Sequence, residues 1–385
     1  MKWEKVKLGD IATFSNGINF NKTAYAKGIK LIGVSNFGDR FYPDYSQLQE
    51  VKKDIVRLED CLRNGDIVFV RSNGNKELVG RCMLVKNPTE RVTYSGFCIR
   101  ARLNDTDRYD PVYFTYYFKS KAFRRAVSGT AVGANIQNLS QARLSNHECR
   151  VPSIEVQHRI ADILSAYDNL IENNQKQIKL LEEAARRLYK EWFVDLRFPG
   201  HENTKIVDGV PEGWIKEEIG KIIKKVHRTK QIVASEYKDE GSIPIVDQSR
   251  AFVAGYTNDL EARVDFGIPI IVFGDHTRIV KLIQFPFAKG ADGTQLIISD
   301  CLEMPQRLLY CSIMNVDLSN YHYARHFKYL KEEKIMIPTV KVANEFENNV
   351  TGIFSKIQNC RDEIIRCQKT RDLLLPKLMS GEVEV

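Results

Sequence analysis

The sequence lacks any long hydrophobic run. No stretch of about 18 apolar residues occurs in its 385 residues, so no membrane-spanning helix is predicted. The first ten residues, MKWEKVKLGD, carry no apolar segment after the lysines and do not resemble a secretory signal peptide. We therefore expect a cytoplasmic protein.

Cysteine is scarce, and its eight residues are scattered without a C-x-x-C pair. This spacing favours neither a disulfide framework nor a zinc site. We expect reduced and mostly buried thiols.

The usual catalytic signatures are also missing. There is no GxxxxGK[ST] phosphate loop, no GxGxxG after a strand, no glycine-rich nucleotide loop of the methyltransferase kind and no G-x-S-x-G elbow. These absences argue against an ATPase, a dinucleotide enzyme, a methyltransferase or a serine hydrolase. The sequence therefore favours a binding protein without catalytic or metal-ligating residues.

Two weak catalytic patterns remain as alternatives. Asp44, Glu50 and Lys52 imitate a nuclease PD…ExK signature, but the short gap does not suit the usual pair of strands. His322 and His326 stand four residues apart, as a metal pair on a helix would, without an evident third ligand. A structural or phosphate-side role is the other interpretation of these histidines.

Charge and composition are ordinary. Apolar residues make up 43% and charged residues 28%, and the net charge is +8. These values exclude extensive disorder and permit, without requiring, a nucleic-acid partner.

The sequence contains an internal repeat of two copies. Trp3 and Trp214 open similar amphipathic segments 211 residues apart, and Pro152 and Pro338 end similar strand-like segments 186 residues apart. The length predicts two or three domains. The repeat favours a tandem duplication.

Each of the two prolines is followed by a heptad pattern. Apolar residues occupy two seams over about five heptads, with Asn174 and Arg371 as polar interruptions that can fix the register. The pattern predicts two long helices of about 38 residues, roughly 57 Å each, paired antiparallel as a coiled coil. Two separate amphipathic helices, each packed on its own domain, are the alternative.

The region before each predicted long helix has the pattern of an α+β fold. Short apolar runs bounded by glycine and asparagine predict strands at 29–35, 65–71, 81–86 and 96–103, and helix at 111–129. The second copy repeats the plan, with strands at 242–249, 267–274, 278–285 and 294–299 and helix at 304–316. We predict curved mixed sheets in both copies.

Polar loops between these elements are the candidate binding surface. They carry Arg, Asn, Lys, His and Thr, which bind base edges and phosphates. Ordinary solvated turns remain the alternative, and Arg124 and Arg125 could instead cap a helix end. The residues predicted to bind DNA are Arg71, Asn73, Asn75, Lys76, Arg124 and Asn135 in the first copy, and His276, Thr277, Arg278, Lys289, Thr294 and Arg325 in the second.

Motifs along the whole chain resemble the specificity (S) subunits of type I restriction–modification enzymes. The more specific signals are the helical segment at 151–193 and the ending LLLPKLMSGEVEV at 373–385. Weaker matches are WEKVKLG at 3–9, RNGDIVFVRSNG at 63–74, PEGW at 211–214 and VFGDHTRIVKLIQFPFAKGADGT at 272–294. One departure is that the glycine-rich segment before Pro152 has no counterpart before Pro338.

The resemblance implies a non-catalytic DNA-recognition subunit. Two target-recognition domains, 1–152 and 201–338, would each read one half of a bipartite asymmetric target, and spacer helices within 153–200 and 339–385 would set the gap. The implied partners are double-stranded DNA, two modification (methyltransferase) subunits and restriction (translocase/endonuclease) subunits. S-adenosylmethionine, ATP and Mg would belong to those partners. A stand-alone DNA nuclease and a protein-interaction scaffold are the alternatives.

Overall fold

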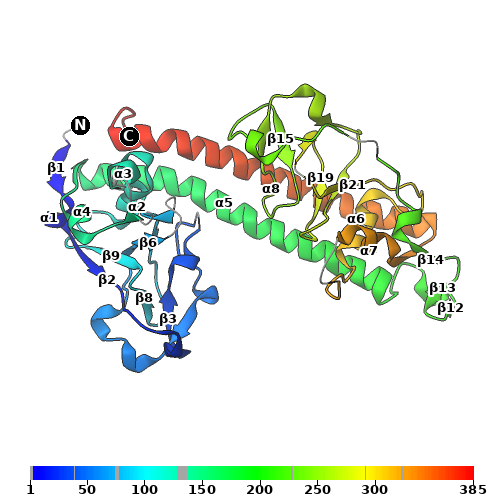
Figure 1. The fold of residues 1–385 in the computed structure, drawn as a ribbon, viewed down its shortest axis with the longest axis horizontal. Coiled ribbons are helices and arrows are strands. Elements are labelled where there is room, and N and C mark those ends of the chain that lie inside the picture. Colours follow the sequence, from blue (N-terminus) through cyan, green and yellow to red (C-terminus); the bar gives the residue numbers. More distant parts are fainter. Residues whose placement is uncertain are drawn as a thin grey trace. The chain divides into compact units, whose positions relative to one another are not determined.

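The computed structural model describes residues 3–38, 40–73, 78–127, 137–226, 229–290, 292–321 and 325–385. The chain divides into two compact units (Figure 1). Unit 1 comprises Met1–Asn173 and Glu363–Val385, and unit 2 comprises Asn174–Asp362. In the described part of the chain, no helix has the length and apolar character needed to cross a membrane.

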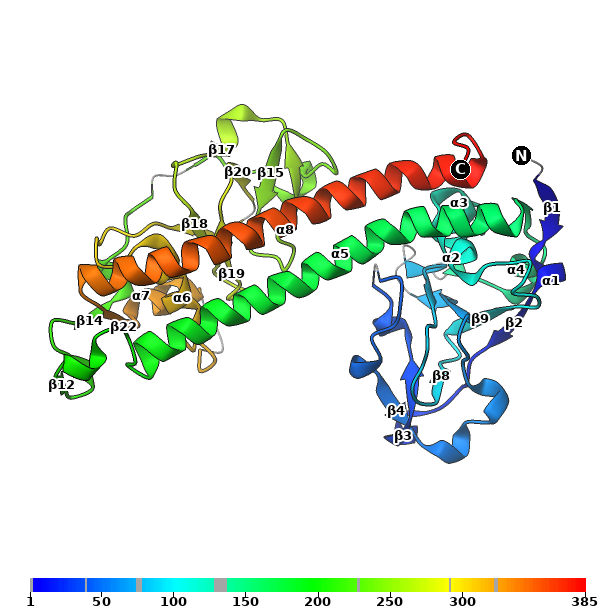
Figure 2. The same ribbon diagram turned by 180° about the vertical axis from the view of Figure 1, so that it is seen from behind.

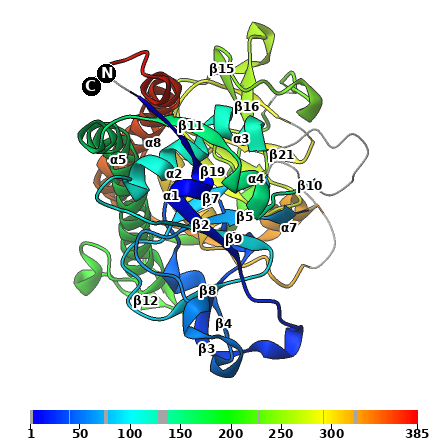
Figure 3. The same cartoon turned by 90° about the vertical axis from the view of Figure 1, so that its left-hand side faces the viewer.

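Unit 1 contains a mixed α+β region with two main sheets. One sheet has the order β2-β9-β5-β7, whose strands are labelled in Figure 3, and the other has the order β4-β3-β8. β5 is buried along its whole length and pairs with β7 on one side and β9 on the other. The bounds are β2 Ala12–Asn16, β3 Tyr25–Ile32, β4 Gln49–Val51, β5 Ile67–Val70, β7 Cys82–Leu84, β8 Val92–Tyr94 and β9 Cys98–Leu103.

Short elements complete unit 1. They are β1 Glu4–Lys7, β6 Ser72–Asn73, β10 Gln137–Asn138 and β11 Glu148–Val151, with helices α1 Leu8–Ile11, α2 Pro111–Lys119, α3 Lys121–Val127 and α4 Gln141–Ser145. The predicted helix at 111–129 is thus broken at Ser120, whose extended backbone separates α2 from α3. Aromatic side chains of α2 fill the core, including the fully buried Tyr113 and Phe114.

Unit 2 repeats this plan with a four-stranded sheet, β16-β15-β20-β17, and a three-stranded sheet, β19-β18-β21. β15 and β20 are parallel, as β3 and β8 are in unit 1. The bounds are β15 Ile243–Val246, β16 Gly255–Thr257, β17 Arg263–Val264, β18 Ile270–Gly274, β19 Val280–Ile283, β20 Phe287–Lys289 and β21 Thr294–Ile297. The other elements are β12 Ile206–Val207, β13 Val210–Pro211, β14 Ile215–Glu218, β22 Lys334–Ile337, α6 Gln306–Met314 and α7 His326–Glu332.

The two copies begin and end their globular regions in the same way. In the first copy, β1 pairs antiparallel with β11, which stops before Pro152. In the second copy, β14 pairs antiparallel with β22, which stops before Pro338. Proline lacks the backbone N–H that would continue the ladder, so each strand ends there and a long helix follows. The predicted duplication and the α+β fold class are confirmed.

The two long helices are α5, Ile154–Tyr189, and α8, Val340–Ser380 (Figure 2). Both units contain part of each helix. In unit 2, Gln177 contacts Cys360 while Tyr189 contacts Phe346, so the helices are paired antiparallel. The predicted seams lie at this contact, where Asn174 is 3% exposed. The paired arrangement is therefore observed rather than two separate helices.

The division into units cuts both helices, whereas the sequence-based boundaries at 152, 200 and 338 keep each helix whole. Those four segments therefore stay a prediction. A π-helical turn, Lys190–Val194, ends α5 and places Trp192 and Phe193 in the core of unit 2. There the ring of Phe193 packs on Trp214 and Phe346.

Candidate DNA-recognition surfaces

Unit 1 brings together the ends of two polar segments, 71–76 and 129–135, that carry most of the residues predicted to bind DNA in the first copy. Arg71 and Asn73 lie beside the segment at 137–139, because Asn73 pairs with Gln137 and the Leu139 amide donates to the Arg71 carbonyl oxygen at 2.9 Å. The Arg71 guanidinium donates to the Gly96 carbonyl oxygen at 3.2 Å. The start of the segment 71–76 is therefore hydrogen-bonded to β10, which follows the segment 129–135.

Three of the predicted residues, Asn75, Lys76 and Asn135, lie outside the described residues. Arg124 lies on α3 and is half-buried. The unit-1 surface is therefore defined only by the ends of its loops.

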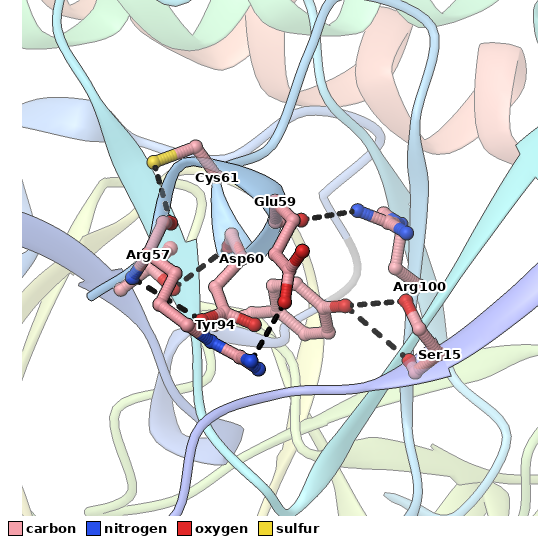
Figure 4. A network of polar contacts seen from close by, with 8 residues as sticks. Ser15, Arg57, Glu59, Asp60, Cys61, Tyr94 and Arg100 are labelled. Carbon is pink, nitrogen blue, oxygen red and sulfur yellow. Dashed lines mark hydrogen bonds and ion pairs between the residues drawn. The ribbon is translucent and has the colours of Figure 1, made fainter. Parts of the chain in front are cut away.

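A separate polar network in unit 1 holds the segment 57–61 against the sheet (Figure 4). The buried Arg100 guanidinium donates to the Glu59 carbonyl oxygen at 3.1 Å. The Tyr94 hydroxyl lies 2.7 Å from Ser15 Oγ, and burial raises the pKa of Tyr94. None of the residues predicted to bind DNA belongs to this network, so we assign it a structural role.

Unit 2 gathers four predicted residues in one pocket of about 280 Å³, called the unit-2 pocket. Its walls come from the β18–β19 turn, the end of β20, the start of β21 and the residue before α7. The predicted residues in it are His276, Lys289, Thr294 and Arg325. The other lining residues are Gln231, Asp275, Asp292, Gly293 and Gln295.

Parallel strands explain why these loops meet. β15 and β20 run side by side, and their ends carry Asp247 and Lys289 to the same edge. In the neighbouring sheet, β18 pairs with both β19 and β21, which places Gly274 opposite Thr294. The Asp275 amide then donates to the Gly293 carbonyl oxygen at 2.7 Å and links the β18–β19 turn to the β20–β21 turn.

The pocket combines cationic, anionic and amide groups. Arg325 and His276 are exposed, whereas Thr294 is fully buried. Burial lowers the pKa of Lys289, an effect that the nearby Asp292 partly offsets. The buried Asp275 carboxylate accepts from the Phe327 amide at 2.8 Å and fixes the start of α7. Such a mixture of donors and acceptors suits the edges of bases as well as phosphates.

Two predicted residues of unit 2 are not part of the pocket lining. Thr277 Oγ1 donates to the Gln248 carbonyl oxygen at 2.7 Å, and the Arg278 guanidinium donates to the Leu318 carbonyl oxygen at 3.0 Å. Arg278 has a φ of +59°, which a tight turn requires. Their assignment to DNA stays a prediction.

Sequence reasoning missed Gln231, Asp292 and Gln295 as individual candidates. Asp292 lies in the turn between β20 and β21, and Gln295 follows the predicted Thr294 in β21, so the polar residue type was the available signal. Gln231 is far away in the sequence and reaches the pocket because its backbone forms a bridge with Lys289. No local pattern marks that bridge.

The carboxylates of the nuclease-like pattern have structural roles in unit 1. The Asp44 carboxylate caps a short helix through Ser46, and its hydrogen bonds to Ser46 and Arg40 lower its pKa to about 2. Glu50 accepts from the Gly28 amide at 2.6 Å. Both carboxylates therefore have local structural partners.

The histidine pattern is only partly described. His322 lies outside the described residues, and His326 is the buried first residue of α7. Among the residues that the structure describes, no three His, Cys, Asp or Glu side chains are grouped so that they could hold a metal ion.

Comparison with known proteins finds similar specificity subunits. Residues 1–183 match the family described as "Type I restriction modification DNA specificity domain". The "Type I restriction enzyme MjaIX specificity subunit" of Methanocaldococcus jannaschii is 29% identical over 335 residues, covering 80% of this chain and 76% of that protein.

The chain is thus similar to type I restriction specificity subunits over most of its length. A second relative from the same organism, the "Putative type I restriction enzyme MjaX specificity subunit", is 26% identical over 266 residues. That match covers 66% of this chain and 61% of the relative.

The fold is shared with a solved S subunit. The crystal structure of the type I restriction–modification S subunit from M. genitalium has a TM-score of 0.59 and 17% identity. The match covers 98% of this chain and 96% of that chain. The tandem α+β plan is therefore shared beyond clear sequence similarity.

Proposed function

We propose that this chain is the non-catalytic DNA-recognition subunit of a type I restriction–modification complex. Each globular region reads one half of a bipartite asymmetric DNA sequence. The observation that carries the proposal is the unit-2 pocket, where His276, Lys289 and Arg325 converge from separate loops in a chain similar to DNA-specificity subunits.

The two globular regions read different half-sites. Their sheets share one plan, but the loops at the ends of the strands differ in length and residue type. Because base edges are read by side chains on those loops, different loops favour different bases. Because the loops of the two copies have diverged, the two half-sites of the target differ in sequence.

The two long helices set the gap between the half-sites. α5 has 36 residues and is about 54 Å long at ~1.5 Å per residue. Its pairing with α8 stiffens it, and a stiff spacer of fixed length favours one number of intervening base pairs.

Catalysis belongs to partner subunits in this proposal. Two methyltransferase subunits supply S-adenosylmethionine chemistry, and restriction subunits supply ATP-dependent translocation and Mg-dependent cleavage. The chain recruits them and directs them to the target. Its cellular location is the cytoplasm.

Lys289→Ala tests the pocket in the full chain bound to methyltransferase subunits. We expect affinity for the target duplex to fall about tenfold and the slope of log affinity against log salt to decrease by about one, because one cation is lost. Lys238→Ala is the matched control, since Lys238 is exposed and is not among the pocket-lining residues. Equal effects of the two substitutions would contradict the assignment.

A further inference from the structure

Three loops of unit 2 meet at one glutamine. Gln248 follows β15, and its Oε1 accepts from the His276 amide of the β18–β19 turn at 3.0 Å. Its Nε2 donates to the Asp292 carbonyl oxygen of the β20–β21 turn at 2.8 Å. Its own carbonyl oxygen accepts from Thr277 Oγ1 at 2.7 Å. One residue therefore joins its own loop to the two loops that carry most of the unit-2 pocket.

Two glycines show how closely these loops fit around Gln248. A Cβ on Gly293, whose φ is +84°, would lie 2.7 Å from both Gln248 Nε2 and His276 Cδ2. A Cβ on Gly274 would lie 2.9 Å from Gln248 Cβ and 2.2 Å from Thr277 Oγ1. Both turns therefore pack closely against the half-buried Gln248 side chain.

A buried lysine fixes the loop that carries Gln248. The Lys281 side chain is 5% exposed, and its Nζ donates to the carbonyl oxygens of Asp247, at 2.8 Å, and of Ala251. The Asp247 carboxylate lies 4.0 Å from the same Nζ and accepts from the Ser249 amide at 2.9 Å. These bonds hold both sides of Gln248 to β19.

We propose that Gln248 is a positioning residue for sequence recognition by unit 2. It acts through the backbone of His276 and Asp292, and so fixes the distances between pocket side chains that come from different loops. Base discrimination depends on such distances, because a displacement of about 1 Å breaks a hydrogen bond with a base edge. The inference rests on the proposed function, since it concerns the same pocket.

Gln248→Met tests the inference, because methionine keeps a similar volume and removes both side-chain hydrogen bonds. Gln248→Glu is the partial variant: it still accepts from the His276 amide and no longer donates to Asp292. Gln49→Met is the matched control, since Gln49 is an exposed strand residue of unit 1. All variants are full chains coexpressed with the methyltransferase subunits, and genomic methylation is mapped.

We expect Gln248→Met to reduce base discrimination on the order of tenfold in one half-site, the half that Lys289→Ala also affects. Gln248→Glu should give a smaller reduction, and Gln49→Met none. The other half-site and the melting temperature should stay close to wild type. Unchanged discrimination in both Gln248 variants, or equal loss in both half-sites, would overturn the inference. A wild-type chain without any sequence preference would instead refute the proposed function.

Discussion

At the scale of single residues, the unit-2 pocket depends on backbone that only glycine accommodates. Gly293 has a positive φ and touches the Gln248 amide. Gly293→Ala should therefore displace the β20–β21 turn and weaken binding of the target duplex about tenfold, with a loss of about 1 kcal/mol in unfolding free energy. Gly267→Ala is a useful control, because Gly267 also has a positive φ but has open space around its Cβ position. Similar losses of DNA affinity in both variants would contradict the role given to the turn.

Lys281 gives a residue-scale prediction about pH. Burial lowers its pKa to about 8, below the ordinary lysine value of 10.5. Between these values the unfolded chain binds more protons than the folded chain, so folding becomes more favourable as pH rises from 8 to 10. Lys281→Met should remove this contribution. We expect the melting temperature of wild type to rise relative to that of the variant over this range, whereas a constant difference would show that the lysine does not titrate there.

At the scale of elements, a charged group ties α2 of unit 1 to both long helices. Arg371 of α8 donates to Asp168 of α5 at 2.5 Å, and the Tyr116 hydroxyl of α2 donates to the same carboxylate at 2.5 Å. The arginine and aspartate side chains are 23% and 20% exposed, so solvent screens the pair only in part. Arg371, which interrupts the apolar seam of α8, therefore has a partner on α5 that specifies how the two helices are aligned.

Asp168→Asn should leave Arg371 with only its ion pair to the exposed Asp372 carboxylate. We expect a loss of about 1–2 kcal/mol in unfolding free energy, less than for a fully buried pair because of the residual exposure. Arg371→Met and the double variant complete a cycle measured by chemical denaturation. Additive effects would show that the two side chains do not interact.

The sequence predicted the long helices and the strand ends better than the contacts of the unit-2 pocket, and the reasons are physical. Heptad spacing predicted both long helices because a seam repeats along one face, and Pro152 and Pro338 marked the ends of β11 and β22 because proline breaks a ladder. Gln248 carries no such local signal. Its contacts join residues 28 and 44 positions away in the sequence, so its role arises only from the pairing of strands.

At the scale of the whole molecule, the proposed spacer makes a prediction about length. One heptad inserted in α5 after Asn173 and one in α8 after Asp362 would fall at the boundaries of the two units and leave the contacts within each unit intact. Each insertion adds about 10 Å of helix, which corresponds to roughly three base pairs. We expect the gap to lengthen by about that number while both half-sites stay unchanged. An unchanged gap in the methylation map would contradict the spacer role.

The central claim is that this chain alone sets a bipartite DNA specificity, one half for each globular region. The most direct measurement is a genome-wide methylation map of cells that express the methyltransferase subunits with the wild-type chain, with Lys289→Ala, or with no specificity chain. We expect one bipartite asymmetric motif that requires the chain, and weakened selection in only one half for the variant. A continuous motif, methylation that persists without the chain, or equal weakening of both halves would contradict it.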